Sequence, residues 1–147
     1  MDFDTRRATS LDKGWLYELY CLTMRTHIEK NWGWDEAFQQ NGFKTNLHPT
    51  KFNIVVVGKS EVGAYLVNEE PDHYWLEMIL IVPEWQGRGL GSEIIRRLQV
   101  VAEQNDKPIK LSVIKVNLVM EFYTRLGFEV YDQDQAVFKL VWNNKST

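Results

Sequence analysis

A glycine-rich turn between a buried strand and a helix is the part of this sequence best suited to chemistry. The apolar run through Leu80, Ile81 and Val82 stops at Pro83, and an amphipathic helix begins about nine residues later. Glycines between them leave backbone N–H groups bare, and the positive end of the helix dipole points at the same place. The turn is therefore suited to hold a pyrophosphate. Its residues are Gln86, Gly87, Arg88, Gly89, Leu90, Gly91 and Ser92.

Glycines at such a place also fit simpler or different roles. A tight strand-to-helix connection alone would use them. Gly58-Lys59-Ser60 ends like a P-loop, but Asn53 stands where the earlier glycine is required, and no helix follows. The turn at Gly87 also resembles the dinucleotide fingerprint, but Ser92 replaces its last glycine. The strands before it read as hairpins, which argues against a doubly wound sheet.

Composition limits the class of protein. The chain has 147 residues with 44% hydrophobic and 25% charged residues, which is typical of a globular domain, and we expect one domain over residues 1–147. The net charge of −3 disfavours nucleic-acid binding. Cys21 is the only cysteine, so no internal disulfide forms, and no Cys/His cluster has metal-ligand spacing. With no apolar run long enough for a signal or a membrane span, we expect a cytoplasmic protein without membrane contact.

Periodicity predicts a strand, two helices and three strands in the first part of the chain. The predicted ranges are a strand over Phe3–Ala8, a helix over Leu11–Lys30 capped by Ser10, a short helix over Asp35–Gln40 ended by Asn41-Gly42, a loop over Phe43–Thr50, and strands over Phe52–Val57, Val62–Asn68 and His73–Val82. The last of these strands is apolar on both faces, which indicates a central place in the sheet.

The second part of the chain alternates helices and strands and closes on a hairpin. The predicted ranges are a helix over Ser92–Gln104 with an apolar stripe of Ile94, Ile95, Leu98, Val101 and Ala102, a strand over Ile109–Ile114, a helix over Leu118–Leu126, and a hairpin of Phe128–Tyr131 with Gln135–Trp142. The order β-α-α-β-β-β-α-β-α-β-β gives an α/β (α+β) fold in which helices flank a mixed sheet.

Two motifs in this order and separation resemble the GCN5-related N-acetyltransferase (GNAT) superfamily. The first is Gln86-x-x-Gly89-x-Gly91; the second is Asn117 followed by Phe122-Tyr123 and Leu126-Gly127-Phe128. The resemblance covers about Val62 to Phe128 well and Met1 to Thr50 only in element order. It implies a splayed, mostly antiparallel mixed sheet and acetyl-CoA as the acyl donor, without a metal.

The resemblance also implies roles for single residues. The turn would bind the pyrophosphate of acetyl-CoA, and Leu80, Ile81 and Val82 would offer backbone groups to its pantetheine arm and thioester carbonyl. Tyr123 would stabilise or protonate the leaving sulfur, and Asn117 would cap its helix and contact the cofactor. A core position for Tyr123 and a purely capping role for Asn117 are the alternatives.

A carboxylate would help to remove a proton from the acceptor amine, whose pKa in water is near ~10. Glu77, on the strand before the turn, is the candidate general base. Since side chains alternate along a strand, Glu77 lies on the face opposite to Leu76 and Met78 unless a bulge intervenes.

An aromatic and acidic segment before Gly42 is the candidate acceptor site. Trp32, Trp34 and Glu36 could hold a cation through ring faces and a carboxylate, and Arg25 could instead pair with a substrate carboxylate. Packing of the indoles at a helix corner is the alternative, so the charge of the substrate stays open.

The sequence thus predicts an acetyl-CoA-dependent N-acetyltransferase acting on a primary amine of a small molecule. The alternatives are a protein or peptide N-acetyltransferase and a catalytically silent acyl-CoA-binding module. Domains of this kind often form homodimers, and the closing strands over 128–142 are a candidate edge or interface.

Overall fold

The computed structural model describes residues 2–45, 48–115 and 119–143. They divide into two compact units. The first unit contains Met1–Leu66 and Met78–Arg88, and the second contains Val67–Glu77 and Gly89–Thr147. The predicted helix start at Leu118 and the predicted cofactor contact at Asn117 lie outside the described residues.

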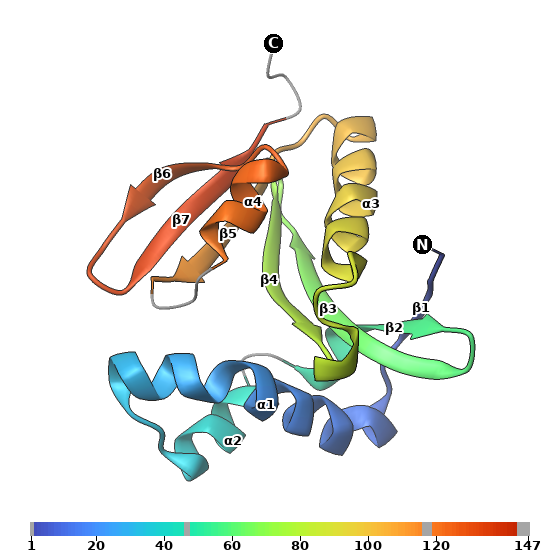
Figure 1. The fold of residues 1–147 in the computed structure, drawn as a ribbon, viewed down its shortest axis with the longest axis vertical. Helices are drawn as coiled ribbons and strands as arrows, with labels where there is room; N and C mark the ends of the chain where they lie inside the picture. Colours follow the sequence, from blue (N-terminus) through green and yellow to red (C-terminus); the bar gives the residue numbers. More distant parts are fainter. Residues whose placement is uncertain (1, 46–47, 116–118, 144–147) are drawn as a thin grey trace. The chain divides into compact units, whose positions relative to one another are not determined.

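The strands form a seven-stranded mixed sheet in the order β1-β2-β3-β4-β5-β7-β6. The pairs β1–β2, β2–β3, β5–β7 and β6–β7 are antiparallel, and β4–β5 is parallel. Helices and strands follow one another as predicted, and β4 has the predicted central place (Figure 1). The predicted fold class is therefore confirmed.

The first unit holds the helices α1 and α2 and the strands β1 and β2. Its elements are β1 (Asp4–Arg7), the 3-10 turn η1 (Ser10–Asp12), α1 (Lys13–Trp32), α2 (Glu36–Thr45), η2 (Pro49–Lys51), β2 (Asn53–Val57), the start of β3 (Ser60–Glu69), the end of β4 (Tyr74–Ile81) and η3 (Pro83–Trp85). Its core is an aromatic cluster in which Phe43 contacts the rings of Tyr17, Tyr20 and Phe52 at centroid distances of 5.4, 5.4 and 6.1 Å.

The second unit holds the helices that follow the glycine-rich turn. Its elements after the turn are α3 (Leu90–Gln104), β5 (Ile109–Ile114), α4 (Met120–Arg125), β6 (Glu129–Gln133) and β7 (Val137–Trp142). Gln99 Nε2 on α3 donates to the carbonyl oxygen of Leu126 at 2.8 Å, which joins α3 to the end of α4. Buried side chains of α3 and β5, among them Ile95 and Ile109, are fully enclosed.

The first long helix begins differently from the prediction. Thr9, not Ser10, is the capping residue: its side chain accepts from the Leu11 N–H, and Asp12 Oδ2 accepts from the Thr9 N–H at 2.8 Å. This reciprocal capping box adds a 3-10 turn before α1. Leu16 is buried on α1, whereas Leu22, an apolar residue of the same helix, is 71% exposed.

The second helix runs past its predicted stop. Asn41 and Gly42 are helical, and α2 continues to Thr45, so the predicted loop over Phe43–Thr50 is wrong in its first part. Phe43 is buried among the aromatic rings of the first unit, so its burial compensates for the poor helix propensity of the Asn-Gly pair.

The helix after the turn starts two residues earlier than predicted, at Leu90. A 3-10 turn, η3, follows β4, and the sequence pattern did not predict it. In the stripe of α3, Ile94, Ile95 and Ala102 are buried, but Val101 is 43% exposed and lies outside the buried face.

Candidate active site

The glycine-rich turn has the backbone shape that only glycine adopts readily. Gly87 has φ +75° and Gly89 has φ +87°, in the region that L side chains rarely occupy. A Cβ atom placed on either glycine would meet no protein atom within 4 Å. The surface above both glycines is therefore open, as an approaching phosphate group requires.

The start of α3 offers free donors beside these glycines. Gly89 is the N-cap, and no side chain caps the helix. The first N–H groups of any helix lack intrahelical partners, and the positive end of the dipole adds to their attraction for an anion. Leu90 is buried and anchors the helix start. The residues present thus fit a pyrophosphate.

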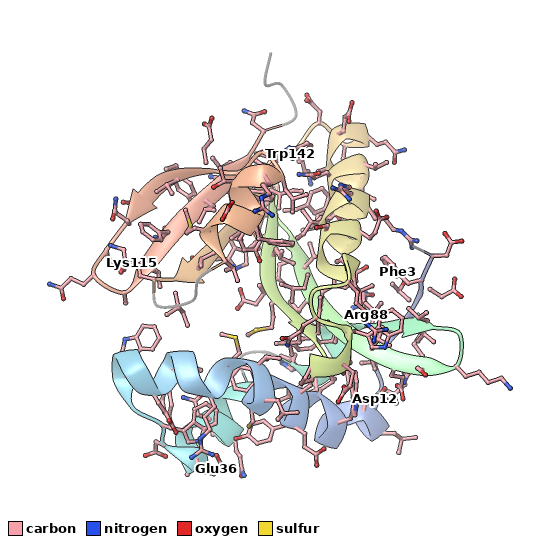
Figure 2. The ribbon with its side chains drawn as sticks, in the orientation of Figure 1. Phe3, Asp12, Glu36, Arg88, Lys115 and Trp142 are labelled. Carbon is pink, nitrogen blue, oxygen red and sulfur yellow. The ribbon has the colours of Figure 1, made fainter. Side chains whose placement is uncertain are left out.

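Side chains of the turn are held in place. Gln86 Nε2 donates to the carbonyl oxygen of Ile81 at 3.0 Å, which ties the turn back to the end of β4. The Arg88 guanidinium lies over the Trp85 ring, 5.0 Å from its centroid. Arg88 is exposed there (Figure 2) and adds a positive charge next to Gly87.

Backbone groups at the end of β4 point alternately toward β3 and away from it. The Val82 N–H donates to the Val62 carbonyl on β3 at 3.0 Å, and the Leu80 carbonyl also lies against β3, at Gly63. Successive N–H groups of a strand point to opposite sides, so the Ile81 N–H points away from β3. Among Leu80, Ile81 and Val82, Ile81 is thus the residue best placed to donate to a ligand.

The parallel pairing of β4 with β5 is short. It joins Tyr74 to Ile109 and Trp75 to Lys110. In the described part of the second unit the ladder goes no further, although Glu77 continues β4 and Ile114 ends β5. Within the second unit, Leu76 and Glu77 therefore lie beyond the ladder with β5.

The two faces of β4 differ in what covers them. The Tyr74 hydroxyl accepts a hydrogen bond from Asn105 Nδ2, at the end of α3, at 3.0 Å. Leu76 shares that face and is buried, whereas Glu77 is exposed. Glu77 therefore lies on the face turned away from α3, as the alternation along a strand predicts. Trp75 is on the same face, and its Nε1–H donates to Glu77 Oε2.

Tyr123 lies on α4 and is 7% exposed. Its ring contacts those of Phe122 and Phe128 edge-on, at centroid distances of 5.0 and 5.6 Å. Burial raises the pKa of the Tyr123 hydroxyl to about 12, so the phenol is protonated at neutral pH. Such a group can donate a hydrogen bond or a proton.

The aromatic and acidic segment splits into two clusters. In the first, Arg25 lies over the Trp34 ring at 5.1 Å, and Trp34 Nε1 donates to Glu36 Oε2 at 2.7 Å. The Tyr17 hydroxyl also donates to Glu36 Oε2, at 3.2 Å. Glu36 is labelled in Figure 2. The Trp34 bond is the main reason that the pKa of Glu36 lies below its usual value. Arg25 is also paired with Glu29 at 2.8 Å.

In the second cluster, Trp32 lines an open cleft of about 260 Å³. The lining residues are Trp32, Gly33, Trp34, Asp35, Phe38 and Gln39. Trp32 is 60% exposed and Phe38 71% exposed. The sequence analysis did not single out Gln39 in this cleft or the bond from Trp75 to Glu77. The spacing Trp75-x-Glu77, which puts both side chains on one face of a strand, was the available signal for the bond.

Among the described residues, no group of three or more His, Cys, Asp and Glu is placed to hold a metal ion. Within the same part of the chain, none of the helices has both the length and the apolar character needed to cross a membrane.

Several solved structures with this fold are named as acetyltransferases. PaiA N-acetyltransferase from Thermoplasma acidophilum, solved with coenzyme A, superposes with a TM-score of 0.77 at 16% identity, over 97% of this chain and 99% of that one. Naa50 from Arabidopsis thaliana, solved with the bisubstrate analogue CoA-Ac-MVNAL, gives 0.68 at 14% identity over 100% of both chains. The ribosomal-protein-S18-alanine N-acetyltransferase from Escherichia coli gives 0.68 at 14% identity, over 99% and 96%.

Sequence similarity gives the family directly. No curated protein matches the chain by sequence. The family model of the acetyltransferase (GNAT) domain matches residues 50–130, which contain the glycine-rich turn, Glu77 and Tyr123. Because this match spans more than half of the chain and the fold agrees with it, the protein belongs to the GNAT family and is an N-acetyltransferase that takes its acetyl group from acetyl-CoA.

Proposed function

We propose that residues 1–147 form a single N-acetyltransferase domain that acetylates a primary amine of a small molecule. The observation that carries this proposal is the open backbone at Gly87 and Gly89 in front of an uncapped helix. The alternative acceptor is a peptide or protein amine, and the same amide donors would serve either reaction.

The turn residues 86–92 would hold the pyrophosphate of the donor, with Arg88 contributing charge. The Ile81 N–H would donate to the donor's amide or thioester carbonyl. Negative charge grows on that carbonyl oxygen during attack, and a fixed backbone donor in a water-poor site stabilises it strongly. Leu80 and Val82 would hold Ile81 in place through their contacts with β3.

Two side chains would move protons. Glu77 would take one proton from the ammonium form of the acceptor, which frees the nitrogen lone pair to bond to the acetyl carbon. The bond from that carbon to the CoA sulfur then breaks, and Tyr123 would donate its proton to the departing thiolate. The second proton that the nitrogen loses would restore the Tyr123 hydroxyl, and the proton held by Glu77 would pass to solvent. Asn117 remains a proposed donor-binding residue on the basis of the family motif.

The acceptor would bind at the cleft of Trp32, with Asp35 as its charge partner. Asp35 Oδ1 accepts from the Phe38 N–H at 2.9 Å, and its second oxygen would accept from the acceptor. Glu36 already accepts bonds from Trp34 and Tyr17, and Arg25 is already paired with Glu29. We therefore assign Trp34, Glu36 and Arg25 to shaping the cleft, and Trp32 to direct contact. Exposed rings next to a carboxylate favour a cationic acceptor over an anionic one.

The peptide alternative is favoured by the openness of this cleft and by two proteins of the same fold, one solved with a peptide-derived analogue and one named for acetylating a ribosomal protein. A lysine or a free N-terminus is also a cation at neutral pH. Size, not charge, therefore separates the two acceptor classes.

The test is a panel of small amines, polyamines, amino acids and peptides, each assayed for acetyl-dependent release of free CoA. In parallel, calorimetry measures the affinity for CoA alone. Turnover with small amines supports the proposal, and turnover confined to peptides supports the alternative. CoA binding without turnover on any amine would identify a silent binding module, and absence of CoA binding would refute the assigned donor site.

A further inference from the structure

We propose that Trp75 is a positioning residue that holds the Glu77 carboxylate in its working orientation. This inference rests on the proposed role of Glu77 as general base. The Trp75 indole N–H donates to Glu77 Oε2, and both side chains lie on the face of β4 turned away from α3.

The position of Glu77 in the sheet explains why it needs a partner. Trp75 forms the last pair between β4 and β5 in the described part of the chain, directly opposite Lys110. Glu77 is the next residue on that face, beyond the end of this ladder. A glutamate side chain has three rotatable bonds and is costly to order. The bond to Trp75 restricts these rotations at the point where β4 leaves its neighbour.

Trp75 is less exposed than Glu77. It is half-buried, whereas Glu77 is exposed. A large planar ring with few rotatable bonds is ordered at low entropic cost, so it is a suitable support for a mobile carboxylate.

The chemistry of the donor also matters. A neutral N–H favours the ionised carboxylate, which is the form that accepts a proton. An arginine or lysine at the same place would stabilise the anion more and weaken it as a base. Charged groups near this part of β4 in the second unit include Lys110 on β5, whose ammonium lies 5.3 Å from the Tyr131 ring centroid, and Lys107, which lies 5.2 Å from the Tyr74 ring centroid. The Asp72 carboxylate lies 2.7 Å from His73 Nδ1.

The first test needs no acceptor. NMR on ¹³C,¹⁵N-labelled protein follows the Trp75 indole proton and the three-bond couplings of the Glu77 side chain. Glu77→Ala should shift the Trp75 indole proton upfield, because its hydrogen-bond acceptor is lost. Trp75→Phe should average the Glu77 couplings between rotamers, because the bond that restricts its rotations is lost. An indole proton that does not respond to Glu77→Ala, or Glu77 couplings unchanged in Trp75→Phe, would overturn the proposal.

The second test uses the best acceptor from the amine panel. Trp75→Phe should lower kcat roughly 3- to 10-fold while KM for acetyl-CoA stays constant, and Glu77→Gln should lower kcat by roughly 10²-fold. Tyr74→Phe is the matched control, since it also deletes one hydrogen bond from β4, but on the opposite face. It should change neither kcat nor the Glu77 side-chain couplings.

The two assignments can fail separately. If Glu77→Gln keeps full turnover, Glu77 is not the base, even where Trp75 holds its side chain. If Glu77→Gln loses turnover while Trp75→Phe behaves like Tyr74→Phe, the base assignment stands and the positioning role is refuted.

Discussion

The carbonyl oxygen of Leu80 lies 2.7 Å from the place that a Cβ atom on Gly63 would occupy. Backbone of β3 and β4 approaches closely here, next to the bond from the Val82 N–H to the Val62 carbonyl. Glycine at position 63 therefore sets where Leu80 and Ile81 lie. Since Ile81 is the proposed donor to the acetyl-CoA carbonyl, we expect Gly63 to influence the geometry of the site without contacting the substrates.

Gly63→Ala should destabilise the protein and weaken acetyl-CoA binding. The added methyl group meets backbone, which cannot rotate away, so we expect a loss of about 1–3 kcal/mol in the free energy of unfolding. Urea denaturation and CoA calorimetry measure the two effects. Gly14→Ala is the control, because a Cβ there meets nothing within 4 Å and alanine favours the helix α1. A Gly63→Ala protein as stable as wild type would contradict the close approach.

Two glycine-to-alanine variants can separate the effect of backbone strain on stability from the effect of ligand contact on CoA binding. Gly89→Ala and Gly58→Ala each place alanine at a positive φ, +87° and +61°, with no protein atom close to the new Cβ. Both should lose about 1–2 kcal/mol of stability. Only Gly89→Ala should also weaken CoA binding, by roughly tenfold or more, because its methyl group occupies the space proposed for the pyrophosphate.

Equal CoA affinity in these two variants would place the pyrophosphate elsewhere. Calorimetry at a pH and temperature where both variants are fully folded makes the comparison.

The strands and the turn could be predicted from the sequence because their signals are local. The strand predicted over Ile109–Ile114 has the observed bounds, and Gly87 and Gly89 adopt the backbone shape that only the glycine pattern indicated. The end of α2 could not be predicted in this way. Asn41-Gly42 is a stop signal by local propensity, and only the packing of Phe43 against rings from α1 overrides it.

The site shows the same limit. The register that leaves Glu77 beyond the β5 ladder, and the bond from Trp75, depend on where a ladder between distant segments ends. Likewise, the sequence grouped Glu36 and Trp32 in one patch. The structure assigns Glu36 to bonds with Trp34 and Tyr17, and Trp32 to the cleft beside Asp35.

Tyr123→Phe should separate donor binding from proton transfer. We expect kcat to fall by roughly 10²-fold, while the affinity for acetyl-CoA stays within about twofold, because only the hydroxyl is removed. Unchanged turnover in stopped-flow and steady-state assays would leave Tyr123 a core aromatic residue.

We also expect Tyr123→Phe to change the stability of the protein at alkaline pH. Burial raises the pKa of Tyr123 to about 12, above the ~10 of an unfolded tyrosine. A raised pKa contributes stability that is fully present below pH ~10 and is lost as the pH rises through about 12. The free energy of unfolding of Tyr123→Phe should therefore fall less steeply with pH above ~10 than that of the wild type, as followed by circular dichroism. An identical alkaline transition in both proteins would mean that the hydroxyl is hydrated.

Trp32→Ala should test whether the cleft binds a cationic acceptor. An ammonium over an exposed ring gains about 0.5–1 kcal/mol or more, so KM for a cationic acceptor should rise by roughly 3- to 10-fold, with KM for acetyl-CoA unchanged. Leu22→Ala is the control, because Leu22 is an apolar residue of the same helix, is 71% exposed and lines no part of the cleft. Asp35→Asn should act in the same direction as Trp32→Ala for charged acceptors, and less for neutral ones. If Trp32→Ala and Leu22→Ala give the same KM for every amine in the panel, the acceptor binds outside this cleft. Residues other than Trp32 and Asp35 would then recognise the charge of the acceptor.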